Sequence, residues 1–345
     1  MTGAQRFDQT SFKLPVTQAV LVQAAMMPQQ TTAHWRPDAA MERHPVLKNI
    51  HVIERGWLSS NNVLIDDGVD AALIDSGYVS HAEQTDALVR RALGGRRLTR
   101  LINTHLHSDH CGGNAKLQRT HDCEIWIPPG QWSDVLHWDT EALGFGPTGQ
   151  RCDRFEPDHR LMPGSSFELG GRPWSVMSAP GHDPHSLILF DARDGVLITA
   201  DALWENGFGI VFPELCGVSA FDEVGVVLDL IESFDAKVII PGHGRPFTDI
   251  QTALARARDR LKAFVADPTK HARHAAKVLI KFRLMEIGSE SEAALLAWGV
   301  SLPYLRVIHQ RYFASQARRS WVEQLVAAMC VTGALRREGI HILNI

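Results

Sequence analysis

The chain has 345 residues, of which 45% are hydrophobic and 21% are charged, and its formal net charge is −4. These values exclude a largely disordered chain, and the length suggests about two domains. Five cysteines without a C-x-x-C pair argue against a disulfide framework, and no apolar run approaches the ~20 residues that span a bilayer, so we expect a cytoplasmic protein without membrane contact.

The first half of the chain alternates short apolar runs with turn residues, a pattern that predicts strands. Residues 1–44 come first and are rich in glutamine, and we expect them to form an N-terminal extension wrapped on the body. An amphipathic stretch that opens at Ser80 or His81 and stops at Gly94 predicts a helix. The expected strands lie at 51–54, 62–66, 71–75 and 98–104.

The second half repeats this alternation, which favours an α/β fold. Strands are expected at 175–178, 186–190, 195–199 and 237–240, and helices at 220–233 and about 249–266. Residues with metal-binding side chains repeatedly follow the strands, where loops on a rigid scaffold usually hold active sites. We place a boundary at Pro268, so that residues 45–268 form the catalytic domain and residues 269–345 a smaller helical domain.

The C-terminal segment is basic and mostly helical. From Lys270 to Ile345 it carries 11 lysines and arginines against 5 glutamates, a charge of +6, whereas the rest of the chain carries −10. Helical runs start near Lys277, Tyr304 and Trp321, and residues 332–339 are expected to form a helix followed by a small hairpin.

The densest group of ligand-type side chains has the pattern His-x-His-x-Asp-His, formed by His105, His107, Asp109 and His110. The first two histidines are two residues apart, so an extended segment can direct both imidazoles at one ion. The aspartate and third histidine follow where the chain turns, and they can reach a second ion. Since imidazole and carboxylate both bind zinc at about 2.0–2.2 Å, this density predicts a metal site.

This pattern resembles the signature of the metallo-β-lactamase superfamily, and four further motifs of that family accompany it in the family's order. They are Leu73-Ile-Asp75-Ser-Gly77, Ala179-Pro-Gly-His182, Thr199-Ala-Asp201 and Pro241-Gly-His243-Gly. The resemblance covers roughly residues 45–265, and it implies an αββα sandwich with the metals at one edge. The C-terminal segment resembles the winged-helix tail of one branch of the superfamily, so we expect a winged-helix-like domain there.

The resemblance also implies a role for each ligand. His105, His107 and His182 would hold a first metal ion, Asp109, His110 and His243 a second, Asp201 would bridge both, and Asp75 would support the ligands from behind. Two ions ~3.5–4 Å apart lower the pKa of bound water and supply a nucleophile at neutral pH. Asp109 is the candidate catalytic residue, since it can steer the hydroxide or carry its proton. We expect two zinc ions, with manganese or iron as alternatives.

Two of these ligands narrow the reaction that the resemblance implies. True β-lactamases of the superfamily do not generally use a bridging aspartate such as Asp201, and its flavodiiron proteins usually carry glutamate at the position of His107. The remaining branches include glyoxalase II, lactonases, thioesterases, phosphodiesterases and a mononuclear-iron persulfide dioxygenase. We expect a hydrolase that uses a metal-bridging hydroxide on a small carboxylic ester, thioester or lactone. The alternative is a phosphodiesterase or ribonuclease that uses the same metals.

Aromatic residues near the motifs could line a substrate pocket for an acyl chain or a ring, or they could belong to the core. The candidates are Trp132, Trp138, Trp204 and Phe208. His185 could bind substrate or have a structural role, and Tyr78 could polarise a leaving group.

The partner of the basic tail stays open. It could bind the phosphates of a nucleic acid or of a coenzyme A thioester, cap the pocket, or form a homodimer. No RNA-binding motif or aromatic stacking platform is visible, so we favour a small-molecule substrate over nucleic acid.

Overall fold

Residues 45–345 are described by the computed structural model, and the extension expected over residues 1–44 lies outside them. Two mixed sheets carry the first part of this region. The six-stranded sheet has the order β1-β2-β3-β4-β5-β6, and the five-stranded sheet the order β11-β10-β9-β8-β7. The strands are β1 (Ile50–Ile53), β2 (Asn62–Asp66), β3 (Ala71–Ile74), β4 (Arg100–Ile102), β5 (Glu124–Ile127), β6 (His159–Arg160), β7 (Ser166–Leu169), β8 (Arg172–Ser178), β9 (Leu187–Asp191), β10 (Val196–Ala200) and β11 (Val238–Pro241).

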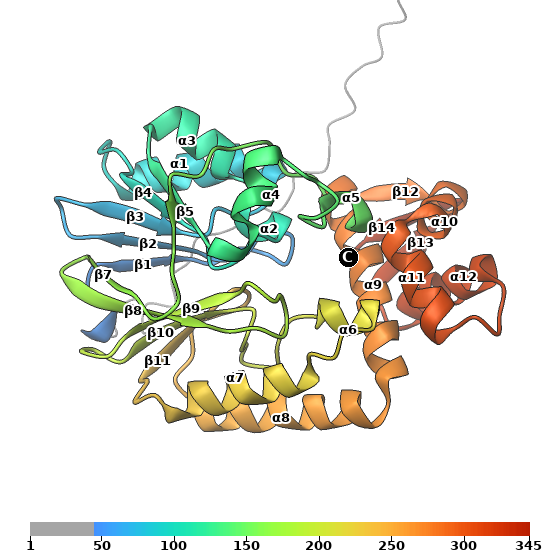
Figure 1. The fold of residues 1–345 in the computed structure, drawn as a ribbon. Helices are drawn as coiled ribbons and strands as arrows, with labels where there is room; N and C mark the ends of the chain where they lie inside the picture. The colour runs from blue at the N-terminus through green and yellow to red at the C-terminus, as the bar shows by residue number, and fades with distance from the viewer. Residues whose placement is uncertain (1–44) are drawn as a thin grey trace, which may run out of the picture. The chain divides into compact units, whose positions relative to one another are not determined.

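Helices cover the outer face of each sheet (Figure 1). The helices of this part are α1 (Ala82–Ala92), α2 (Ser108–Cys111), α3 (Asn114–His121), α4 (Trp132–His137), α5 (Phe145–Thr148), α6 (Phe212–Cys216), α7 (Phe221–Ser233) and α8 (Ile250–Ala266), with 3-10 turns at Pro45–Leu47, Val79–His81 and Pro129–Gln131. Helices α1 and α3 pack on the first sheet, and α7 and α8 on the second.

Side chains that point alternately to the two faces of each sheet explain how helices and sheets form layers. On β3, Leu73 belongs to the cluster beneath the helices, whereas Ala72 and Ile74 join the cluster between the two sheets. Leu101 and Ile102 on β4 divide in the same way. Because successive side chains of a strand point to opposite faces, these strands are buried on both sides and read as continuous apolar runs. The expected αββα sandwich is confirmed.

The C-terminal region packs around one hydrophobic core, which includes Leu279, Leu305, Trp321 and Ile342 and also takes in Ile210 and Leu215 from the catalytic part. Its elements are α9 (Pro268–Ile287), β12 (Ser289–Ser291), α10 (Glu292–Ser301), α11 (Pro303–Tyr312), α12 (Arg318–Val331), β13 (Leu335–Glu338) and β14 (His341–Asn344). The strands form a three-stranded sheet in the order β12-β14-β13.

The predicted helical character and terminal hairpin of this region are confirmed, and one detail is corrected. Residues 335–338 are the first strand of the hairpin, not the end of a helix, because the glycine at 333 adopts a φ of 74° and stops α12. The winged-helix assignment and the boundary at Pro268 stay proposals. Only the single residue Asp267 separates α8 from α9, and its side chain accepts a hydrogen bond from Thr269 N at 3.1 Å.

Two further expectations concern cysteines and membranes. All five cysteines are free, as the sequence predicts. No helix within residues 45–345 combines the length and the apolar character needed to cross a bilayer.

A buried histidine joins α9 to the catalytic part, and we expect it to make folding stability depend on pH. His271 Nε2 accepts a hydrogen bond from Val211 N at 3.1 Å, and burial, aided by His274 and Arg260, lowers the pKa of His271 to about 3. In the unfolded chain His271 therefore takes up a proton below pH 6.5, whereas in the folded chain its ring stays neutral. The contribution of His271 to the free energy of unfolding is complete above pH 6.5. It falls by about 2 kcal/mol between pH 7 and pH 5.

Urea unfolding at several pH values checks this prediction. His271→Gln keeps an acceptor for Val211 N but does not titrate, so its free energy of unfolding should fall less steeply below pH 6.5. Identical pH slopes for the variant and the wild type would contradict the assignment.

Candidate metal centre

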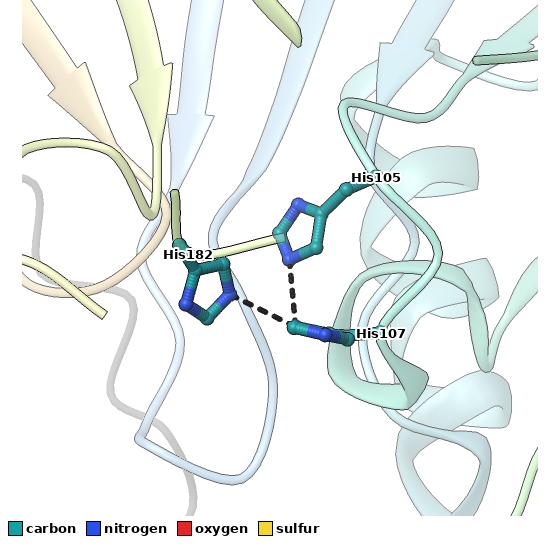
Figure 2. A group of neighbouring side chains, drawn as sticks. All are labelled: His105, His107 and His182. Carbon is teal, nitrogen blue, oxygen red and sulfur yellow. Dashed lines mark hydrogen bonds between the residues drawn. The ribbon is translucent and has the colours of Figure 1, made fainter. Parts of the chain in front are cut away.

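Three histidines bring their ring nitrogens together at the edge where the strands of the two sheets end (Figure 2). His105 and His107 follow β4, and His182 follows β8. His107 Nδ1 lies 3.1 Å from His105 Nε2 and 2.9 Å from His182 Nε2. Nitrogen ligands at ~2.0–2.1 Å around a tetrahedral ion lie about 3.3 Å apart, so this spacing fits one shared cation.

A second group consists of Asp109 and His110, both on α2, and His243, which follows β11. Asp109 Oδ2 lies 3.1 Å from His243 Nε2 and 4.0 Å from His110 Nε2. His110 Nε2 is buried and makes no hydrogen bond within residues 45–345. A buried polar atom without a partner is costly, and a cation between these three side chains would provide one.

Asp201 lies between the two groups. Its Oδ2 is 3.4 Å from His182 Nε2, whereas its Oδ1 is 3.5 Å from His110 Nε2 and 3.8 Å from His243 Nε2. A Cβ on Gly242 would lie 2.2 Å from Asp201 Oδ1, so only glycine fits beside this carboxylate. Each carboxylate oxygen thus faces a different ligand group, which is the placement that a bridging ligand needs.

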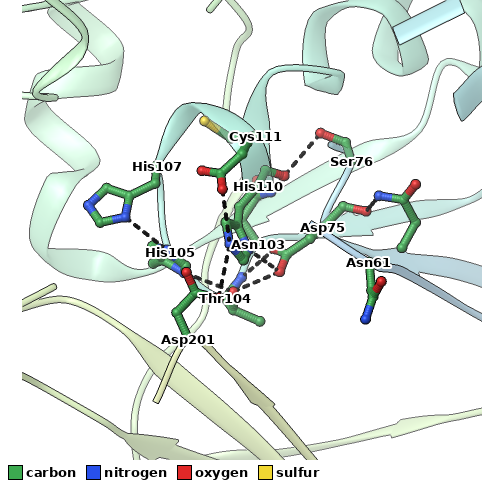
Figure 3. Close-up of polar contacts among 12 residues, drawn as sticks. Asn61, Asp75, Ser76, Asn103, Thr104, His105, His107, His110, Cys111 and Asp201 are labelled. Carbon is green, nitrogen blue, oxygen red and sulfur yellow. Dashed lines mark hydrogen bonds and ion pairs between the residues drawn. The ribbon is translucent and has the colours of Figure 1, made fainter. Parts of the chain in front are cut away.

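Asp75 orients the candidate ligands through hydrogen bonds to Thr104 and His110 (Figure 3). Its carboxylate accepts hydrogen bonds from His110 Nδ1 at 2.8 Å, Thr104 Oγ1 at 2.8 Å and Thr104 N at 2.9 Å. On the other side of the site, His182 Nδ1 donates to Ile210 O at 2.6 Å. Each bond fixes the ring tautomer and leaves Nε2 as the atom aimed at a metal.

The charges of the site suit a divalent cation. Burial lowers the pKa of His105 well below normal, and it lowers the pKa of His107 and of His182 to about 4, so these rings are neutral. Burial would raise the pKa of the Asp201 carboxyl, but His110 and His243 outweigh it and hold this pKa well below its usual range. Neutral imidazoles and an ionised carboxylate are the ligand forms that metals require.

His110 behaves differently from the other histidines. Burial lowers its pKa, but Asp75, Asp201 and Asp109 together outweigh burial and raise it well above normal. Without a cation, a proton on this ring balances the surrounding carboxylates. A divalent ion supplies the same compensation, and the donor set therefore fits the expected metals.

A cavity of about 1090 Å³ opens beside the centre, and Asp109, Asp201 and His243 lie on its wall. Trp57 stacks on His243 with ring centroids 5.2 Å apart, and Phe212 meets His107 edge-on at 4.9 Å. These rings place apolar surface directly against His243 and His107.

The pocket candidates from the sequence divide into two groups. Trp204 and His185 line the cavity, and Trp204 Nε1 donates to Asp201 Oδ1 at 3.1 Å. Trp132, Trp138 and Phe208 do not line it, which corrects the expectation for these three.

Packing explains where the three other aromatic rings lie. Trp132 packs against the cluster beneath α1 and α3, with the guanidinium of Arg160 4.7 Å from its ring centre. Trp138 meets Phe155 edge-on at 5.5 Å, and Phe208 is buried in the cluster beneath α7 and α8. Tyr78 is also fully buried, where its hydroxyl accepts a hydrogen bond from Arg151 N at 3.1 Å.

Sequence reasoning missed Trp57, and it gave a C-terminal wall of the cavity only as one of several alternatives for the basic tail. Trp57 belongs to the loop between β1 and β2, which carries no motif. The wall comes from α9 and α11 and includes Val278, Phe282 and Val307. The amphipathic pattern of α9 was a usable signal, because 278, 282 and 285 share one helix face.

Comparison with known proteins agrees with this geometry. A family model described as the metallo-beta-lactamase superfamily matches residues 55–243. The human acyl-coenzyme A thioesterase MBLAC2 is 28% identical over 212 residues, which cover 55% of this chain and 73% of the relative. Hydroxyacylglutathione hydrolase GloC of Haemophilus influenzae is 28% identical over 207 residues, which cover 57% of this chain and 91% of the relative.

Solved structures share the fold over more of the chain. The metallo-beta-lactamase family protein TTHA1429 from Thermus thermophilus aligns with a TM-score of 0.52 at 18% identity, covering 87% of this chain and all of that one. A beta-lactamase domain protein from Burkholderia ambifaria aligns with a TM-score of 0.51 at 20% identity, and the alignment covers 86% of this chain and 91% of that one.

Proposed function

The chain belongs to the metallo-β-lactamase superfamily and is a hydrolase of that superfamily, and from this premise we propose that it cleaves thioesters of carboxylic acids with two bound metal ions. The observation that carries the proposal is the pair of ligand groups that share Asp201 and open into the cavity. The relatives support the choice of thioester, because an acyl-coenzyme A and a hydroxyacylglutathione are both thioesters.

Each group of the site has a part in this reaction. Two divalent ions held there, which we propose to be zinc, would activate a water molecule and polarise the substrate carbonyl. Asp109 lines the cavity, and its pKa is lowered by His110 and His243 despite burial, so its carboxylate is ionised and can accept the proton that the attacking water loses. The Trp204 indole N–H orients the Asp201 carboxylate.

The leaving group supports a thioester over an ordinary ester. A thiol has a pKa near 8.5, so a thiolate departs with little help from an acid. An alkoxide needs a proton donor. Tyr78, which the sequence offered for this role, is fully buried and does not line the cavity, so an ester would depend on the proton that Asp109 has accepted.

A panel of substrates tests the proposal. Zinc-loaded protein should hydrolyse acyl-coenzyme A and acyl-glutathione thioesters with a higher kcat/KM than an acyl lactone, a phosphodiester or short RNA. Cleavage of only the phosphodiester or the RNA would refute it.

The arginines of the tail give no support to the nucleic-acid alternative. Arg319 pairs with Glu323 at 3.0 Å and Arg336 with Glu338 at 2.8 Å, and neither arginine lines the cavity. Exposed ion pairs of this kind each contribute under about 1 kcal/mol to stability, so replacing the two arginines by glutamate should leave the fold intact.

We therefore expect the double variant Arg319→Glu/Arg336→Glu to keep its thioester kcat/KM within about twofold of the wild type. Steady-state kinetics at low and high salt measure this. A loss of tenfold or more that depends on salt concentration would show that the basic tail takes part in substrate binding.

A further inference from the structure

One wall of the cavity is built by the C-terminal region. Val278 and Phe282 on α9 and Val307 on α11 line it. Phe212 connects this wall to the metal centre, because its ring lies 4.9 Å from that of His107 and 5.5 Å from that of Tyr304 on α11. A molecule that reacts at the ligands can thus extend from Phe212 along α9 and α11 without leaving the cavity.

The charged residues along this wall are turned away or neutral. Lys281 Nζ donates to Ala334 O at 2.7 Å and Ile345 O at 2.9 Å, both in the terminal segment. Arg260 Nη1 donates to Phe208 O at 3.2 Å. Burial lowers the pKa of His274 to about 4, which leaves its ring uncharged. The surface that this wall exposes to the cavity is therefore mainly apolar.

Apolar side chains also reach the rim. Val218 and Val307 both line the cavity, and they are 61% and 38% exposed. The volume of about 1090 Å³ slightly exceeds the range for pockets that hold a drug-sized ligand, about 300–1,000 Å³. A two- or three-carbon acyl group would leave most of this apolar surface in contact with water.

We propose that the wall formed by α9 and α11 binds the acyl chain of the substrate, so that thioesters of medium- and long-chain acids are preferred over short ones. The inference rests on the proposed function, and it assigns chain selection to the C-terminal region, outside the residues that match the family. Each methylene buried against the wall should strengthen binding about fourfold until the cavity is filled.

Hydrolysis of saturated acyl-coenzyme A thioesters with 2 to 16 carbons tests the inference. In the wild type, KM should fall with each added pair of carbons up to a limiting length. Val307→Asp places a charge in the wall, and its loss of kcat/KM relative to the wild type should grow with chain length, to about a hundredfold or more for the longest substrates. The matched control is Val331→Asp. Val331 lies on α12, is 88% exposed and does not line the cavity, so this variant should keep the wild-type dependence of kcat/KM on chain length.

A binding measurement separates this inference from the proposed reaction. If the thioesters are hydrolysed at rates independent of chain length, the proposed function stands and the inference is overturned. If no thioester is hydrolysed, calorimetric titration of the full-length protein with hexadecanoate decides. Binding that Val307→Asp weakens would uphold the acyl wall and refute only the reaction, whereas no binding would overturn the inference.

Discussion

Asp201→Ala is expected to lower kcat for thioester hydrolysis about a thousandfold, which corresponds to about 4 kcal/mol of lost transition-state stabilisation. Asp201 Oδ2 faces the first histidine group and Oδ1 the second, so one substitution removes a ligand from both. The ionised carboxylate also offsets the repulsion between two cations, and alanine cannot do so.

Steady-state kinetics of zinc-loaded protein measure this effect, with Asp259→Ala as the matched control. Asp259 is exposed on α8 and does not line the cavity, so its replacement should leave kcat within about twofold of the wild type. An Asp201→Ala enzyme with more than a tenth of the wild-type kcat would show that the reaction does not depend on the shared carboxylate.

Asp75→Asn is expected to have the second largest effect, a roughly 10- to 100-fold loss of zinc affinity with a parallel loss of activity. Asp75 accepts hydrogen bonds from His110 Nδ1 and from Thr104, and its charge makes His110 a stronger ligand. Asparagine has nearly the same shape and tolerates the positive φ of 58° at this position, so the variant removes the charge and one of the two acceptor oxygens while it keeps the backbone conformation.

A second carboxylate–histidine pair offers the control. Asp86 accepts a hydrogen bond from His121 Nε2 at 2.9 Å in a buried pair that lies outside the metal centre. Asp86→Asn should lower stability but leave zinc affinity unchanged, as measured by competition with a chromophoric chelator. Equal losses of affinity in both variants would mean that Asp75 acts only through the stability of the fold.

The strands were predictable where a local pattern decides the structure. Residues 62–66 and 71–74 form strands as expected, since apolar runs between turn residues need no distant partner to be recognised. The strands β5, β6, β7 and β12 were missed. β5 begins with the exposed polar Glu124 and takes its place from parallel pairing with β4, which local sequence does not encode.

The grouping of the candidate ligands was predictable from the sequence, and the walls of the cavity were less so. The motifs mark each ligand by residue type, and the structure brings the two groups and Asp201 together. The cavity wall depends on the packing of α9 and α11 beside α5 and α6, and α5 is more than 100 residues from α9 in the sequence. Trp132 and Trp204 have the same residue type, and only tertiary packing puts the first in a core and the second beside Asp201.

The zinc content of the full-length protein tests the central claim most directly. The chain is loaded with zinc, desalted exhaustively and measured by inductively coupled plasma mass spectrometry against protein concentration. Two zinc ions per chain are predicted for the wild type, and one or fewer for Asp201→Ala. One ion or none in the wild type, or two in the variant, would contradict a two-metal centre bridged by Asp201.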